Sequence, residues 1–167
     1  GFMVQQEWRE ILENSLTADG ENWFGWFHLG IMRFYAGEYE AAGEAWERSD
    51  QIHPNAWTLR NLAVLASLEN EPEAAADRYL SAHRLNPLLR PLTLETCRSL
   101  LTAKRPQDCL DLLSNLPEVE RANGRLRYLE ALAAMDCEDF DRVARVLESG
   151  IEVSDLREGE VALSDLW

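Results

Sequence analysis

The chain has 167 residues, of which 46% are hydrophobic, and a formal net charge of -14 at pH 7. This length fits one ordinary domain or one short array of repeats, and the apolar fraction is large enough to build a core, so we do not expect disorder. The acidic balance argues against nucleic-acid partners and against anionic membrane surfaces, because both need basic patches.

The cysteines and the apolar runs bear on the cellular compartment. Cys97, Cys109 and Cys137 show no CxxC spacing. An odd number of cysteines without regular spacing favours a reducing compartment over a disulfide framework. Neither a signal peptide nor an apolar run long enough to span a membrane is visible. We therefore expect a cytoplasmic protein without a membrane partner.

Residues 3–18 are predicted to form a helix, because apolar residues recur along one stripe. The stripe contains Val4, Trp8, Ile11, Leu12 and Ser15. A shift of 34 residues places Trp8, Leu12 and Ser15 on Ala42, Trp46 and Ser49. This correspondence indicates that the chain starts halfway through a repeat, either as a natural terminal cap or within a longer array.

Residues 22–54 carry the motif on which the interpretation of the whole chain depends. Its residues follow the spacing W-x2-L-G, A-x3-F, P of the tetratricopeptide repeat, here as Trp26, Leu29, Gly30, Ala42, Trp46 and Pro54. We expect two antiparallel helices, at about 22–36 and 38–53, with Asn22 as the N-cap of the first. The small residues Gly30 and Ala42 allow the helices to approach closely. Arg33 departs from the motif, which usually has tyrosine at this position.

The same pattern returns three more times with decreasing strength. At a shift of 33 residues, helices are expected at about 56–69 and 72–85, with Pro72 at the first position of the second helix. A third copy, shifted by 34, has Thr96 where the second has Leu62. A fourth copy, at about 123–149, matches the pattern only weakly. Beyond Gly150 the helical period of apolar residues ends.

These patterns predict an all-α fold, a tetratricopeptide-like right-handed superhelix of antiparallel helix pairs. The expected segments are a lead-in helix at 3–20, repeats at 22–54, 55–87, 88–117 and 119–149, the last two degenerate, and an extended tail at 150–167.

A narrower resemblance involves three segments, NWFGWFHLGIMRF, NAWTLRNLAVLA and DLREGEVALSDLW. They resemble the C-terminal repeat region of large bacterial multidomain proteins, whose N-terminal part has β-sandwich domains of uncharacterised function. The resemblance implies that any chemistry belongs to a part of such a protein outside this chain, and a fold analogy transfers no activity to these residues.

The reactive side chains form no convergent catalytic set, so we expect no catalytic residue, no metal and no cofactor, and we do not expect an enzyme. His53 and His83 fall near the ends of second helices, where they suit the helix dipole. His28 lacks neighbours at metal-ligand spacing. Cys97 and Cys109 occupy two small-residue positions that touch in this architecture, as buried apolar side chains or, alternatively, as a redox-sensitive pair.

The concave face is the best candidate for function, because the first helices of tetratricopeptide arrays line an inner groove. In this register the predicted partner-binding residues are Phe24, Phe27, Ile31, Phe34, Trp57, Arg60, Val64, Leu94, Arg98 and Tyr128. Aromatic and arginine side chains dominate interface energetics. Part of this set could equally be core between repeats.

We therefore expect a non-catalytic protein–protein interaction scaffold that binds through an apolar, aromatic groove. The occupant could be another domain of the same polypeptide, a second copy in a homodimer, or an unrelated protein. The alternative is an accessory or dimerisation module of a larger carbohydrate-processing enzyme whose catalytic domain is absent from this chain.

Overall fold

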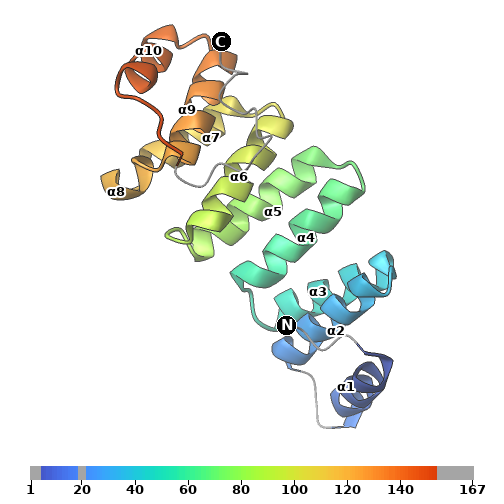
Figure 1. Ribbon diagram of the computed structural model, residues 1–167. Coiled ribbons are helices and arrows are strands. Elements are labelled where there is room, and N and C mark those ends of the chain that lie inside the picture. The colour runs from blue at the N-terminus through green and yellow to red at the C-terminus, as the bar shows by residue number, and fades with distance from the viewer. Residues whose placement is uncertain (1–4, 19–21, 154–167) are drawn as a thin grey trace. The chain divides into compact units, whose positions relative to one another are not determined.

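A computed structural model describes residues 5–18 and 22–153, and every regular element in these residues is a helix (Figure 1). This confirms the all-α class. The helices are α1 (Gln6–Ala18), α2 (Trp23–Tyr35), α3 (Tyr39–Ile52), α4 (Ala56–Leu68), α5 (Pro72–Leu85), α6 (Arg90–Thr102), α7 (Pro106–Ser114), α8 (Glu118–Arg121), α9 (Gly124–Asp136) and α10 (Phe140–Glu148).

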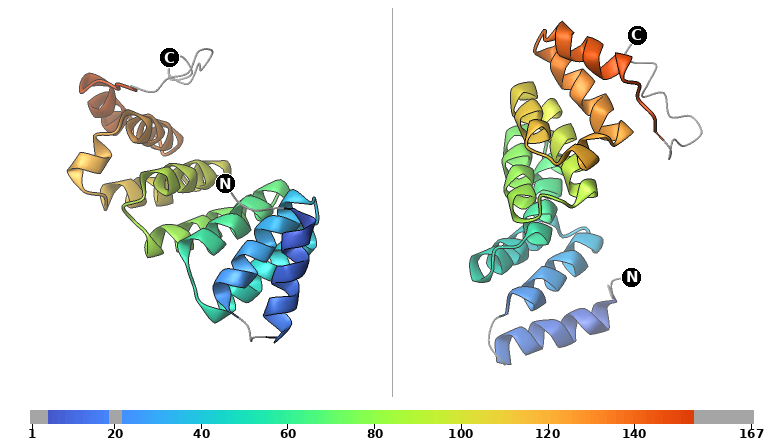
Figure 2. Two further views of the ribbon diagram at one scale, coloured as in Figure 1. Left: turned by 60° about the horizontal axis from the view of Figure 1, so that its bottom comes forward. Right: turned by 90° about the vertical axis from the view of Figure 1, so that its left-hand side faces the viewer.

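The helices divide into two units, Gly1–Asn86 and Pro87–Trp167. In the first unit α2 packs along α3 and α4 along α5, while α3 also contacts α4 and α1 contacts α2 (Figure 2). In the second unit α6 contacts α7 and α9, α7 contacts α9, and α9 contacts α10. The two helix pairs expected over residues 22–85 are therefore present.

Asparagine caps begin three of the first helices. The Asn22 side chain accepts a hydrogen bond from the Gly25 amide at 2.7 Å, as expected from the sequence. Asn55 caps α4 and Asn123 caps α9 in the same way. Such caps satisfy amide groups that the first turn of a helix leaves without partners. Pro72 stands at the start of α5, also as expected.

The turn within each helix pair ends the first helix with a residue in the left-handed region. These residues are Gly37, Asn70, Lys104 and Glu138, with φ of 81°, 59°, 58° and 57°. After each of them the next amide donates back into the helix, as Glu38 does to the Arg33 carbonyl and Asp139 to the Ala134 carbonyl. This pattern is the Schellman motif. The positions recur every 33 or 34 residues, the period of the sequence pattern.

Helices α2 and α3 meet at Gly30. A Cβ at this position would lie 2.8 Å from Cε2 of Trp46, so only glycine leaves room for the indole ring. The indole Nε1 donates to the Phe27 carbonyl at 3.1 Å. Trp46 is 2% exposed and belongs to one cluster with Ile31, Ala42, Leu62 and Leu65. The core thus runs from α2 through α3 to α4.

Arg33, at the usual tyrosine position of the motif, joins three helices by polar contacts. Its Nη1 donates to the Ala41 carbonyl at 3.1 Å, and its Nη2 pairs with Glu13 at 3.3 Å. Glu13 also pairs with Arg9, which bonds Glu38 at 2.7 Å. A charged network therefore links α1, α2 and the start of α3 where the motif would place an aromatic ring.

The second unit buries both polar and thiol groups. Thr96, the residue that replaces a large apolar one in the third copy, is fully buried, and its hydroxyl donates to the Leu92 carbonyl at 2.8 Å. Cys97 and Cys109 are also fully buried, and their thiols share a hydrogen bond. These contacts explain how small polar residues fill the positions between α6 and α7.

The second unit contains one short helix that the sequence did not predict, and only the first residues of the expected tail are described. The one-turn helix α8 follows Pro117, and Asn123 caps the next helix directly after it. No hydrophobic period can show so short a helix. Residues 151–153 have neither helix nor strand, and the Glu152 carbonyl lies against Gly124. The rest of the tail expected at 150–167 lies outside the described residues.

Gly30→Leu should destabilise the first unit by about 1–3 kcal/mol or more, because the new side chain overlaps Trp46. Urea denaturation measures the loss. Ala36→Leu, which introduces the same side chain at an exposed residue, should stay within about 0.5 kcal/mol of the wild type. Equal stability of both variants would contradict the close packing of α2 on α3.

Glu138→Gly should raise the free energy of unfolding by about 0.5–1 kcal/mol, because glycine adopts a positive φ without the steric cost of a Cβ. Gly37→Ala should lower it by about 1 kcal/mol for the same reason. Denaturation of both variants tests the sign. If Glu138→Gly lowered the free energy of unfolding instead, the steric cost of the positive φ would not be the main effect of residue 138 on stability.

Candidate functional site

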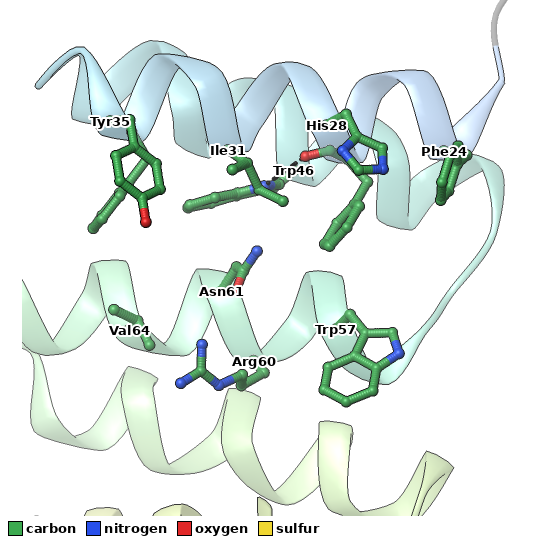
Figure 3. A pocket seen from close by; sticks show the side chains of 11 residues that line it. Phe24, His28, Ile31, Tyr35, Trp46, Trp57, Arg60, Asn61 and Val64 are labelled. Atoms are coloured by element: carbon green, nitrogen blue, oxygen red, sulfur yellow. Dashed lines mark hydrogen bonds between the residues drawn. The ribbon is translucent and has the colours of Figure 1, made fainter. Parts of the chain in front are cut away.

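An apolar groove of about 770 Å³ lies within the first unit, between α2 and α4 (Figure 3). Its floor includes Trp46 from α3. We call this site the apolar groove. Its lining consists of Phe24, Phe27, His28, Ile31, Phe34, Tyr35, Trp46, Trp57, Arg60, Asn61 and Val64.

Helical spacing brings these side chains together. On α2 the lining residues recur three and four positions apart, from Phe24 to Tyr35, so they form one stripe. On α4 Trp57, Arg60 and Val64 repeat the same spacing and line the groove from the second wall (Figure 3). The two walls come from the first helices of successive pairs, and the packing of both helices on α3 sets the distance between them.

The floor and the rim of the groove differ in burial. Ile31 and Trp46 are 7% and 2% exposed and belong to the core, and Phe27 and Phe34 pack against the same cluster. At the rim, Phe24 is 55% exposed and Trp57 is 50% exposed. The rim aromatics are the ones that a partner can contact without disturbing the core.

The groove contains one charged side chain, Arg60, and no carboxylate among its lining residues. Asn61 adds an amide on the same wall. The imidazole of His28 stacks edge-on with the rings of Phe24 and Phe27, at 4.4 and 5.3 Å between ring centroids. Burial lowers the pKa of His28. The imidazole therefore behaves as part of the aromatic wall near neutral pH.

Seven of the ten residues predicted for partner binding line this groove, and three do not. Leu94 and Arg98 lie on α6 and Tyr128 on α9, all in the second unit. The role of all ten in binding stays a prediction.

The sequence interpretation missed four lining residues. His28, Tyr35 and Asn61 each directly follow a predicted groove residue, so a wider stripe on each helix would have included them. Trp46 was interpreted only as a residue of the repeat motif. Its position in the motif does not show that a buried ring can also line a groove.

The reactive groups do not converge elsewhere in the described part of the chain. Residues 5–18 and 22–153 hold no cluster of three or more metal-ligating side chains. The Cys97 thiol is fully buried, and its hydrogen bond with Cys109 and its burial raise its pKa. His53 is the C-cap of α3, whereas His83 is buried in the last turn of α5. None of the helices in this region has the length and apolar character needed to cross a bilayer.

Comparison with solved structures identifies the fold. The crystal structure of YrrB, described as a TPR protein with an unusual peptide-binding site, matches 96% of this chain and 82% of its own, with a TM-score of 0.74 and 14% identity. A MamA structure from AMB-1 matches 93% of this chain and 85% of its own, with a TM-score of 0.67 and 20% identity. Another MamA crystal structure has a TM-score of 0.66 and 16% identity over 84% and 82% of the two chains.

At these identities the likeness shows the fold alone, and it confirms a tetratricopeptide-like helical architecture. Neither the protein-family models nor the curated proteins gave a match to the chain.

The burial of His28 predicts a pH dependence of stability. Its pKa in the folded chain lies below its ordinary value near 6.5, so the unfolded chain binds this proton more tightly. The stability that neutral His28 provides is present above about pH 6.5 and is lost as the pH falls through that value toward the folded pKa. Between about pH 7.5 and 5.5, wild type should lose more stability than His28→Gln. Parallel pH profiles from urea denaturation would contradict this assignment.

Proposed function

We propose that this chain is a non-catalytic protein-interaction module whose apolar groove holds an apolar segment of a partner protein. The observation that carries the proposal is an open groove with half-exposed aromatic side chains on both rims, in a chain of net charge -14. Apolar surface of this kind on a highly charged protein marks an interaction site. Aromatic rims with one arginine are also the composition of energetic anchors at interfaces.

The chemistry of the lining describes the expected occupant. The apolar walls favour aliphatic or aromatic side chains, and Arg60 and Asn61 offer polar contacts on the α4 wall. The chain has a net charge of -14, so basic residues flanking the apolar segment would be attracted to it. YrrB, a structure of the same fold, is described as having an unusual peptide-binding site, which supports the same kind of ligand.

Two narrower versions of the proposal concern the origin of the partner. The resemblance to the C-terminal region of large bacterial proteins favours a role as an accessory module, in which the segment belongs to another domain of the same polypeptide. A second copy of the chain would instead make the groove a dimer interface. The three free thiols agree with a cytoplasmic setting. We also propose that the chain is divided into repeats as the sequence pattern predicts. The left-handed turn residues, which recur every 33 or 34 positions, support this division.

Peptide selection with Trp57→Ala as the probe variant tests the groove. Apolar peptides selected from a random phage-displayed library on the wild-type chain should bind Trp57→Ala about ten- to hundred-fold more weakly, a loss of about 1–3 kcal/mol, because Trp57 is a rim anchor. Calorimetry measures the affinity. The melting temperature should change little, since half of Trp57 is exposed.

The matched control is Phe140→Ala, which removes an aromatic ring that is 67% exposed on α10. It should bind the selected peptides as the wild type does. Phe34→Ala is a less clean probe, because Phe34 packs against the core and lies 5.7 Å from the Trp46 ring between centroids. If the peptides bind Trp57→Ala and Phe140→Ala equally well, the groove is not the site. Light scattering of wild type and Trp57→Ala separates self-association from peptide binding.

A further inference from the structure

His28 is the histidine of the apolar groove (Figure 3). Its side chain leaves α2 between the rim residue Phe24 and the core residue Ile31. The imidazole contacts the rings of Phe24 and Phe27 edge-on, with 4.4 and 5.3 Å between the ring centroids. The residue is half-buried. A segment that fills this part of the groove therefore covers the part of the imidazole that still meets water.

The lining of the groove is poorly suited to a proton on His28. The charged side chain of the lining is Arg60 on α4, which carries the same sign of charge as an imidazolium. Tyr35 is the other titratable lining residue, and a phenol is ordinarily neutral below about pH 10. No carboxylate belongs to the lining. Protonation of His28 would therefore place a second positive charge in the same apolar site.

The helices packed against α2 are α1 and α3. The buried residues of α3 are Ala42, Gly43, Ala45, Trp46 and Ser49. None of these side chains titrates, and Trp46 is the one that reaches the lining. Helix α1 brings Arg9 and Glu13, which belong to the network around Arg33. Arg33 follows His28 by five positions, about 140° around the helix, so this network lies on another side of α2.

The protonation of His28 and the occupancy of the groove are linked. Burial already lowers the pKa of His28 in the free chain. An apolar segment laid over the imidazole removes more water and lowers the pKa further, because an apolar environment disfavours the charged form. As the pH falls through the pKa of the free chain, the free chain gains a proton that binding must expel. The affinity for the segment then decreases.

We propose that His28 makes the apolar groove pH-sensitive, so that a bound apolar segment is held at neutral pH and released on acidification. This inference rests on the proposed function, since it needs an occupant of the groove. An acidic occupant would give the opposite sign, because its carboxylate would pair with the imidazolium. The net charge of -14 disfavours such an occupant.

Calorimetric affinities at about pH 7.5 and 5.5 test the coupling, a window around the ordinary histidine pKa. The probe is a peptide selected on the wild-type chain from a phage-displayed library without histidine, aspartate or glutamate. It is synthesised with acetylated and amidated ends, so that the peptide itself does not titrate. The wild-type chain should bind it about three-fold or more weakly at the lower pH, since a shift of one pKa unit corresponds to a limit of about ten-fold in affinity. Binding to the wild type near the middle of this window should also release protons, measured as a dependence of the heat on the ionisation enthalpy of the buffer.

His28→Gln removes the titrating group, so it should lose most of the difference between the two pH values. The ratio of affinities is compared within each variant, so a change in absolute affinity does not affect the result. His53→Gln is the matched control, because His53 caps α3 and its ring contacts Trp23 outside the lining. This control should keep the wild-type ratio. Circular dichroism at both pH values verifies that the three proteins are folded.

Failure of the coupling and failure of the proposed function give different results. A wild-type affinity that is equal at both pH values, or that rises on acidification, overturns the coupling and leaves the proposed function standing. An equal ratio in wild type and His28→Gln overturns it as well, because another group would then titrate. If Trp57→Ala binds the peptide at neutral pH as tightly as the wild type, the groove is not the site, and both the proposed function and the coupling fail.

Discussion

The first unit depends on the contact between Trp46 and the bare backbone of Gly30. Because glycine has no Cβ, the indole ring reaches the backbone of α2 and donates to the Phe27 carbonyl. The same ring packs with Leu62 and Leu65 of α4 and forms the floor of the apolar groove. One side chain therefore joins the helix pair, connects it to the next pair and supports the site. A core that is also the floor of a site couples stability to binding, because a change at the floor cannot leave the fold untouched.

The rim of the groove is separable from this core. Phe24 and Trp57 are each about half exposed, so they contribute little to folding and are accessible for the proposed contacts with a partner. Arg60 on α4 supplies the single charge of the lining. This division between floor and rim is what one expects of a binding surface on a helical scaffold, where a rigid framework presents anchors at fixed spacing.

Helix α1 shows how a departure from the motif can be structural. Arg33 replaces the usual aromatic residue, and the guanidinium contacts both Glu13 of α1 and the Ala41 carbonyl of α3. A charged group at this position is tolerated because its partners lie on both neighbouring helices. The network holds α1 against its neighbours by ion pairs on one side.

The sequence by itself determined the helical period, the Asn22 cap, the start of α5 at Pro72 and the close approach at Gly30, because each is set by local spacing or by the chemistry of a single residue. It also placed seven residues on one groove, since residues three and four apart on a helix share a face. Only the tertiary structure decided which of these residues are floor and which are rim, because burial depends on how α2 and α4 sit on α3. It alone separated Leu94, Arg98 and Tyr128 from the groove of the first unit. It alone showed that Trp8 and Ile11 are exposed, because a helical stripe does not reveal which of its residues the other described helices cover.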